Sequence, residues 1–169
     1  MTTTIDPTAV DAETRLTAVE DIRILRARYW RFVDTKNWAG FRTLFAPEAT
    51  FSDHSADFHC HGADDIAGKI SAVLEPVFTA HHGHQAEILV HDAEHASGIW
   101  AMDDYLIFPP GVPHPTNPMP TEVVRGWGHY YDEYVKRDGR WLFAKVDLYR
   151  LRLEVGGSSS TPYPTAPER

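Results

Sequence analysis

Cysteine and basic residues are both scarce in this chain of 169 residues, and each shortage excludes a class of protein. Because Cys60 is the only cysteine, no disulfide can form within the chain, and we expect a reducing compartment, the cytoplasm. Sixteen lysines and arginines stand against 24 aspartates and glutamates, a formal net charge of −8. Binding to phosphate groups needs clustered basic side chains, so we expect no nucleic-acid partner.

Long apolar stretches are missing as well. No run approaches the roughly 20 apolar residues that cross a bilayer, and the first residues lack the basic and apolar segments of a signal peptide, so we expect no membrane contact. The hydrophobic fraction of 43% is ordinary for a globular protein, and the length suits one domain with a sizeable core. We predict that domain over residues 14–155, between a flexible arm over 1–13 and a flexible tail over 156–169.

The N-terminal part of the chain has the spacing of helices. From residues 11–14 to residues 34–37, apolar side chains recur at steps of three and four, which predicts one amphipathic helix. Its apolar stripe consists of Val19, Ile22, Leu25, Tyr29, Phe32 and Val33. Two shorter helices are expected over 38–45 and 63–77, each closed by a proline.

The C-terminal half alternates polar and apolar residues instead, which is the period of β-strands. Strands are predicted over residues 49–53, 82–90, 96–108, 122–136 and 140–154. The Asp138-Gly139 pair between the last two is a strong signal for a hairpin turn. Helices first and a meander of strands afterwards predict an α+β fold, in which a curved antiparallel sheet carries helices on one face.

One long segment between two predicted strands cannot belong to the sheet. Residues 109–120 contain six prolines, which cannot donate the backbone hydrogen bonds of a central strand or helix. We expect a long loop at one end of the sheet, either a lid over a cavity or an extended surface connection.

Two predicted strands carry a charged residue at the end of an apolar face. Arg150 continues a face formed by Leu142, Ala144, Val146 and Leu148. Asp104 continues a face formed by Gly98, Trp100 and Met102. An isolated buried charge costs many kcal/mol, so Arg150 and Asp104 either pair at the rim of one cavity or both reach solvent at the strand ends.

Asp34 follows the apolar stripe of the first helix. A carboxylate at the end of a buried face is either a helix-terminal cap or a working group in a pocket, and we favour the pocket.

Histidine is abundant, with ten residues in the chain. Five of them form two clusters: His59, His61, His81, His82 and His84. The His82-x-His84 spacing can bind zinc on a strand, but no spacing singles out a third ligand among His59, His61, Glu87 and His129. A general base is the more economical role for a histidine, so we expect no metal.

The identity of that base depends on the strand register. Simple alternation places His82 inside the sheet and His81 outside. A bulge at Gly83 would reverse this arrangement, so the residue pattern leaves His81 and His82 both open.

Several motifs together resemble the SnoaL-like branch of the nuclear transport factor 2 superfamily. They are Ile24 to Trp30 with Val33-Asp34-x-x-x-Trp38, Thr79 to His84 with Glu87-Ile88, Ala96-x-Gly98-x-Trp100-Ala101-Met102-x-Asp104, and Tyr130-x-x-x-Tyr134-x-x-x-Asp138-Gly139-x-Trp141. The resemblance covers residues 18–152 and is strongest to the bile acid 7α-dehydratases and more distant to the scytalone dehydratases. It implies a cone-shaped mixed or antiparallel sheet wrapped around the N-terminal helices.

The resemblance also implies a set of catalytic residues: Tyr29, Asp34, His81, Asp104 and Arg150. It favours His81 over His82 as the base, with Asp34 fixing its tautomer and Tyr29 donating to an enolate oxygen. Asp104 and Arg150 would form a supporting pair. Neither a metal nor another cofactor is implied.

The activity implied is dehydration of a hydrophobic ring compound or a polyketide- or steroid-like carbonyl compound. The residues expected to contact this substrate are Trp38, His82, Trp100, Met102 and His129. An isomerase or cyclase with the same base, and a non-catalytic binding or assembly module, are the alternatives. A cavity of at least roughly 300 Å³ lined by both Asp34 and His81 would favour catalysis.

Two geometric expectations remain. Tyr29 and Asp34 are five residues apart, about 140° around a helix, so they face one ligand only if the helix ends near Asp34 or the ligand spans both. Trp127, Tyr131 and Phe143 are predicted on the outer face of the sheet, where their exposure indicates a homo-oligomer. Proteins similar to this one pair or trimerise through this face of the sheet, and we expect a trimer rather than a dimer.

Overall fold

A computed structural model describes residues 10–112, 123–156 and 158–160. The helices are α1 (Ala12–Asp34), α2 (Trp38–Arg42) and α3 (Ala63–Leu74). The strands are β1 (Phe45–Asp53), β2 (Phe58–His61), β3 (Phe78–Val90), β4 (His95–Ile107), β5 (Val123–Arg137), β6 (Arg140–Val155) and β7 (Ser158–Ser160). Most of the predicted arm, residues 113–120 of the proline-rich loop and most of the predicted tail lie outside the described residues.

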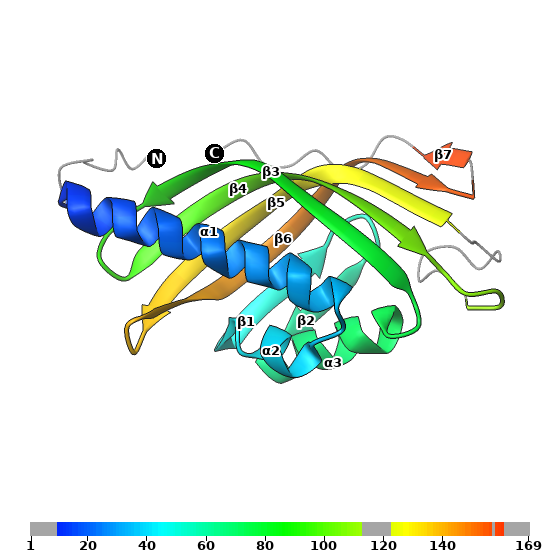
Figure 1. Cartoon of the computed structure of the whole chain (residues 1–169), viewed down its shortest axis with the longest axis horizontal. Helices are drawn as coiled ribbons and strands as arrows, with labels where there is room; N and C mark the ends of the chain where they lie inside the picture. Colours follow the sequence, from blue (N-terminus) through cyan, green and yellow to red (C-terminus); the bar gives the residue numbers. More distant parts are fainter. Residues whose placement is uncertain (1–9, 113–122, 157, 161–169) are drawn as a thin grey trace.

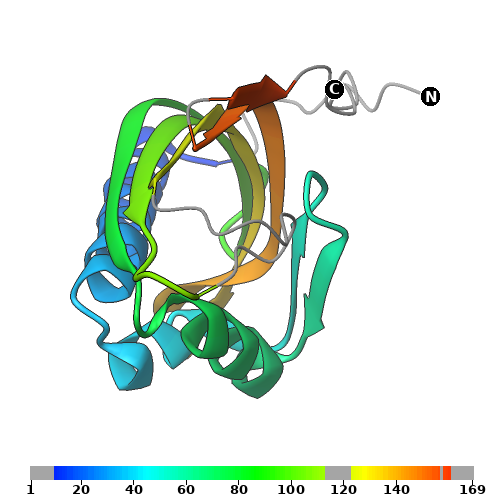
Figure 2. The ribbon, with the colours of Figure 1, turned by 90° about the vertical axis from the view of Figure 1, so that its right-hand side faces the viewer.

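The strands form one strongly curved sheet in the order β2-β1-β6-β5-β4-β3, with β7 paired to β6. Strands β1 and β6 run parallel and the other neighbours antiparallel, so the sheet is mixed. In Figure 1, α1 lies along the sheet, and in Figure 2 the strands curl into an unclosed cone with α2 and α3 below. The predicted α+β cone is confirmed.

Helix α1 supplies the apolar layer that packs against this sheet. Asp11 caps its first turn, because the Asp11 carboxylate accepts the backbone N–H of Thr14 at 2.9 Å. The buried stripe consists of Ala18, Ile22, Leu25, Tyr29 and Val33. Val19 and Phe32, which were predicted in the stripe, are only partly buried, whereas Arg26 and Trp30 are buried without having been predicted.

A β-bulge at Gly83 decides which histidine points into the cone. The pairing of β3 with β4 shifts between Gly83 and Ala86. Odd-numbered side chains therefore point inward before the shift, and even-numbered ones point inward after it. The His81 side chain is therefore 7% exposed, whereas that of His82 is 62% exposed. His81 is thus the histidine that points into the cone, and its role as the base stays a prediction.

Only glycine fits at this bulge. A Cβ atom on Gly83 would lie 1.7 Å from the Trp30 ring of α1, and Trp30 is itself buried. We expect Gly83→Ala to destabilise the protein by about 3 kcal/mol, because overpacking forces buried groups apart. Urea unfolding followed by circular dichroism measures this change.

The matched control is Gly68→Ala, on the exposed side of α3. Nothing lies within 4 Å of a Cβ atom at Gly68. Alanine is the better helix former, so this variant should gain about 1 kcal/mol. Equal urea midpoints for the two variants would contradict the packing assigned to Gly83.

A second bulge corrects the prediction for β6. The pairing of β5 with β6 shifts between Glu133 and Tyr134, which skips Ala144. Phe143 therefore points into the core and is fully buried, so its prediction as an outward residue is wrong. Trp127 is 37% exposed, and the predicted homo-oligomer, with a trimer favoured, stays a prediction.

Element boundaries differ from the pattern in the first half of the chain. Helix α2 ends at Arg42 and α3 at Leu74, both earlier than expected, and β2 was not predicted. Strand β1 begins at Phe45 and includes Pro47, because its pairing with β6 is irregular between Phe45 and Thr50 and leaves room for a residue without an N–H. None of the helices in the described part of the chain is long and apolar enough to cross a membrane.

Candidate active site

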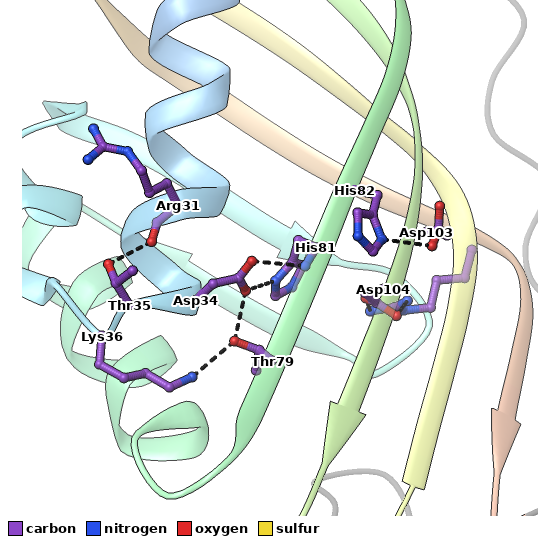
Figure 3. A network of polar contacts seen from close by, with 10 residues as sticks. Arg31, Asp34, Thr35, Lys36, Thr79, His81, His82, Asp103 and Asp104 are labelled. Carbon is purple, nitrogen blue, oxygen red and sulfur yellow. Dashed lines mark hydrogen bonds and ion pairs between the residues drawn. The ribbon is translucent and has the colours of Figure 1, made fainter.

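The carboxylate of Asp34, at the end of α1, faces His81 on β3 (Figure 3). Asp34 Oδ1 lies 2.7 Å from His81 Nδ1, and Asp34 Oδ2 accepts the backbone N–H of His81 at 3.0 Å. The Thr79 hydroxyl donates a third hydrogen bond, to Oδ1, at 2.8 Å. All these partners belong to β3, so the Asp34 carboxylate joins helix to sheet and does not cap α1.

These contacts fix the charge of Asp34 and the tautomer of His81. Burial alone would raise the pKa of Asp34, but the hydrogen bonds and charge of His81 outweigh it, and the pKa lies below its ordinary value. A carboxylate can only accept a hydrogen bond, so the proton of a neutral His81 sits on Nδ1. The other ring nitrogen, Nε2, is then free to accept a proton.

An ion pair joins β4 to β6 inside the cone. Arg150 Nη1 and Nη2 donate to the two carboxylate oxygens of Asp104 at 3.1 and 2.8 Å. Arg150 Nε also lies 3.6 Å from Asp53 Oδ2. The side chains of Arg150 and Asp104 are 11% and 1% exposed, so the predicted pairing is confirmed and the alternative of two solvated side chains is not.

The Asp104 carboxylate is ionised because of this pair. Burial would raise the pKa of Asp104, but the Arg150 charge outweighs it and holds that pKa below its ordinary value. Arg150 is shifted in the opposite sense, since the Asp104 charge overcomes burial and raises the pKa of Arg150.

A cavity of about 120 Å³ is lined both by His81 and by the Asp104–Arg150 pair. Its polar lining consists of Tyr29, Asp53, Ser55, His81, Asp104, Tyr130 and Arg150. Its apolar lining includes Phe51, Phe58, Ile70, Leu106, Phe108 and Leu153. Four of the five predicted catalytic residues therefore meet at one cavity, and Asp34 reaches it only through His81.

The cavity does not meet the size criterion set from the sequence. It is smaller than roughly 300 Å³, and Asp34 is not in its wall. It is neither filled by side chains nor remote from His81, so it fits a compact molecule rather than a large one. Tyr29 and Asp34 therefore do not both face one ligand. Helix α1 continues to Asp34, which lies behind His81, and of the two residues only Tyr29 lines the cavity.

Tyr29 and Tyr130 place two phenol rings at the cavity wall, with their centroids 6.0 Å apart. Burial raises the pKa of the Tyr29 hydroxyl to about 12, although the nearby Arg26 charge lowers it. Burial also raises the pKa of Tyr130 well above its ordinary value. Both hydroxyls therefore keep their protons near neutral pH and can act as hydrogen-bond donors.

The buried guanidinium of Arg26 lies behind this pair. Its Cζ atom is 3.8 Å from the Tyr130 ring centroid and 4.4 Å from that of Tyr29, which is cation–π geometry. Its charge is balanced by Asp132, whose carboxylate lies 3.4 Å from Arg26 Nε. The apolar stripe of α1 gave no signal for this cation.

None of the five residues predicted to contact the substrate lines the cavity: Trp38, His82, Trp100, Met102 and His129. Trp100 and Met102 are buried on the inner face but under α1, where Trp100 packs edge-on against Trp30. Trp38 donates its indole N–H to Glu75, His82 is exposed beside Asp103, and His129 pairs with Ala101 and Tyr149 within the sheet. We therefore remove these five from the proposed site.

Asp53, Ser55 and Tyr130 are the polar cavity residues that the pattern did not select. Asp53 ends the apolar face of Ala49 and Phe51 on β1, just as Asp104 continues an apolar face on β4, and this signal could have identified it. In the described ranges no group of three or more His, Cys, Asp or Glu residues is placed to hold a metal ion. The His82 and His84 rings instead both contact the Asp103 carboxylate, at 3.1 and 2.7 Å.

Comparisons with known proteins agree with the expected fold. The family described as SnoaL-like domain matches residues 14–147. A hexachlorocyclohexane dehydrochlorinase, LinA type 2, is 18% identical, with a TM-score of 0.73 over 93% of this chain and 98% of that one. A scytalone dehydratase-like protein from Novosphingobium aromaticivorans DSM 12444 is 18% identical, with a TM-score of 0.71 over 85% and 90%. LinA type 3 from Novosphingobium barchaimii LL02 is 17% identical, with a TM-score of 0.73 over 90% and 99%.

Proposed function

Because the chain belongs to the SnoaL-like domain family, within the nuclear transport factor 2-like superfamily, we propose that it is a lyase that eliminates water from compact hydrophobic ring compounds. One observation carries this proposal: the His81 imidazole lines a mostly apolar cavity while Asp34 binds its other ring nitrogen, Nδ1. A base so oriented can remove a proton from carbon next to a carbonyl group without a cofactor.

The first step is proton transfer. His81 Nε2 takes the proton from the carbon next to the substrate carbonyl, and the electron pair of that C–H bond forms an enolate. Tyr29 donates a hydrogen bond to the enolate oxygen, where negative charge develops, and Tyr130 stands beside it as a second donor. The Asp34 carboxylate stabilises the imidazolium that forms.

The second step is loss of the leaving group. The enolate electrons form a carbon–carbon double bond as the bond from the β-carbon to the hydroxyl breaks. The His81 imidazolium returns its proton to the departing hydroxide, which leaves as water, so the base is regenerated and all atoms balance. Arg150 pairs with both Asp104 and Asp53, so these three charged side chains are held in place in the cavity wall.

The cavity supports a compact substrate. A space of about 120 Å³ suits one ring better than the four fused rings of a steroid. The similar structures named as dehydrochlorinases and as a scytalone dehydratase-like protein are named for elimination reactions, which supports the reaction class. We therefore place small cyclic β-hydroxy ketones before polyketide- and steroid-like compounds.

The test is the conversion of 3-hydroxycyclohexanone to cyclohex-2-enone, followed by ultraviolet absorbance of the conjugated product. A fused-ring β-hydroxy ketone and hexachlorocyclohexane, the latter with chloride release as the readout, complete the panel. The wild type should act on the single-ring ketone, and His81→Gln should lose the activity. The matched control His82→Gln, on the exposed face of the same strand, should keep it.

Other outcomes would replace this proposal. Deuterium exchange next to the carbonyl in D₂O, without enone, would indicate an isomerase or cyclase that uses the same base. Saturable binding of the panel without turnover would indicate a binding module. Full activity of His81→Gln would remove the proposed base.

A further inference from the structure

Lys36, two residues after the end of α1, has a backbone conformation that side-chain-bearing residues rarely adopt. Its φ angle is 58°, in the left-handed region. This is the position after the helix cap, where the N–H of Asn37 reaches back to the carbonyl of Phe32 at 2.8 Å. Glycine is the usual residue there because it has no Cβ to clash. A lysine at this position needs an explanation from its side chain.

The Lys36 side chain begins a chain of hydrogen bonds that ends at the proposed base (Figure 3). Lys36 Nζ donates to the hydroxyl oxygen of Thr79 at 3.0 Å. The Thr79 hydroxyl donates to Asp34 Oδ1 at 2.8 Å, and the same oxygen contacts His81 Nδ1 at 2.7 Å. Because the ammonium occupies the acceptor side of the Thr79 hydroxyl, the hydroxyl proton must point toward Asp34.

The Lys36 ammonium is the positive charge on the outer side of the Asp34–His81 dyad. Asp34 and Glu75 face the Lys36 ammonium, and burial lowers the pKa of Lys36 although both carboxylates raise it. On the cavity side the dyad faces Asp104, which is paired with Arg150. A cation therefore stands on each side of the Asp34–His81 pair, one on the cavity side and one toward the exterior.

We propose that Lys36 is a positioning residue for the Asp34–His81 dyad, which it holds in place through Thr79 and whose working pH range its charge sets. This inference rests on the proposed function. The strained backbone places the ammonium within reach of Thr79, so the sequence keeps a lysine where glycine would be easier to fold. Removing the charge makes it easier to protonate the dyad and leaves the Thr79 hydroxyl free to turn away.

Kinetics of three variants test the proposal. In Lys36→Met, kcat should fall about 5- to 20-fold with little change in KM, because the loss affects proton transfer and not binding. The acid limb of its pH–rate profile should move up by about half a pH unit, the size expected for one charge removed at this distance in a wet environment. Lys36→Arg, which keeps the charge, should recover most of the activity.

Lys36→Gly separates a mechanistic role from a structural one. Relief of the left-handed conformation should raise the melting temperature by about 2–4 °C, while kcat falls as it does in Lys36→Met. Lys69→Met is the control, since Lys69 contacts Asp65 on the exposed side of α3 and is remote from the dyad. Wild-type kcat and pH profile in both Lys36→Met and Lys36→Gly would overturn the proposal.

A readout without turnover distinguishes this proposal from the proposed function. The carboxyl carbon of Asp34 can be titrated by nuclear magnetic resonance, and its pKa should be higher in Lys36→Met than in the wild type. A wild type without elimination activity, but with this upward change, would defeat the reaction and leave the positioning role of Lys36. An unchanged Asp34 titration in an active enzyme would defeat the role of Lys36 alone.

Discussion

Asp34→Asn is expected to lower kcat by about 10³- to 10⁴-fold while leaving the fold intact, in line with the loss seen when the orienting acid of a catalytic triad is replaced by its amide. Asparagine has nearly the same shape as aspartate, and the site lies at the end of α1, where the side chain reaches β3 without entering the core. The expected loss is therefore in proton transfer and not in stability.

The direction of each hydrogen bond explains the size of this loss. The backbone N–H of His81 donates to Asp34 Oδ2, and a backbone N–H cannot reverse its role. The carbonyl oxygen of an asparagine must take that position, so its NH₂ group takes the position of Oδ1, opposite His81 Nδ1. Nδ1 must then accept a hydrogen bond, which moves the ring proton to Nε2 and leaves no basic nitrogen for the substrate.

Asp103→Asn is the matched control on the other face of the sheet. The Asp103 carboxylate also contacts two histidine rings, those of His82 and His84, but both are largely exposed. The same substitution there should leave kcat within about two-fold of the wild type, as expected for an exposed pair. Nitrogen-15 spectra of the histidine rings would report the tautomer directly, and an Asp34→Asn enzyme with wild-type turnover would contradict the dyad.

The periodicity of the sequence was sufficient to predict the architecture but not the local register. Steps of three and four predicted α1, and alternation predicted β3 to β6, because one-sided burial leaves its period in the sequence. The bulges at Gly83 and Ala144 each reverse that alternation, and a bulge depends on what packs above the strand. A glycine within a strand indicates a possible bulge, so the bulge at Gly83 could be anticipated, whereas nothing in the sequence indicated the one at Ala144.

The candidate site was predictable where a polar residue ends an apolar pattern. Asp34, Asp104 and Arg150 all have that signature, and the structure places them around one dyad and one ion pair. The expected substrate contacts of Trp100 and Met102 did not allow for the helix above them, although both residues are buried on the inner face. Helix α1 covers part of that face, and Trp30 packs over Trp100, so only the uncovered end of the cone remains open.

Arg26 shows a further limit of pattern reading. An arginine within an amphipathic helix is ordinarily assigned to the solvent face, yet Arg26 is fully buried against Asp132. What makes this burial possible is an acceptor 106 residues away and four aromatic rings around the guanidinium, of which Tyr130 and Phe143 are also distant in sequence. The tyrosines at the cavity wall thus owe their electrostatic surroundings to a residue that periodicity alone does not reveal.

Arg150→Met is expected to cost about 3–5 kcal/mol of stability at pH 7. The side chain of Asp104 is only 1% exposed, so loss of Arg150 leaves a buried carboxylate without its bidentate partner. Breaking a buried pair from one side is costly because the remaining charge stays desolvated. Methionine keeps most of the apolar stem of the arginine and is flexible enough to fill part of the remaining space, which limits the loss that comes from a cavity.

The sign of the pH dependence identifies the unpaired charge as the cause. In the wild type the pKa of Asp104 is below its unfolded value, so its contribution is present above that unfolded value and is lost as the pH falls through the folded pKa. Without Arg150, burial raises the pKa of Asp104 above the unfolded value. The variant therefore recovers stability on acidification, and its deficit relative to the wild type should shrink from pH 7 to pH 5.

Urea unfolding of both proteins at the two pH values measures this difference. Asp104→Asn introduced into the Arg150→Met background should recover part of the loss at pH 7, because a neutral amide costs less to bury than a carboxylate. Arg42→Met, which breaks the exposed pair with Asp64, should change stability little at either pH. A deficit of equal size at pH 5 and pH 7 would contradict the unpaired Asp104 carboxylate as its cause and would point instead to lost packing around residue 150.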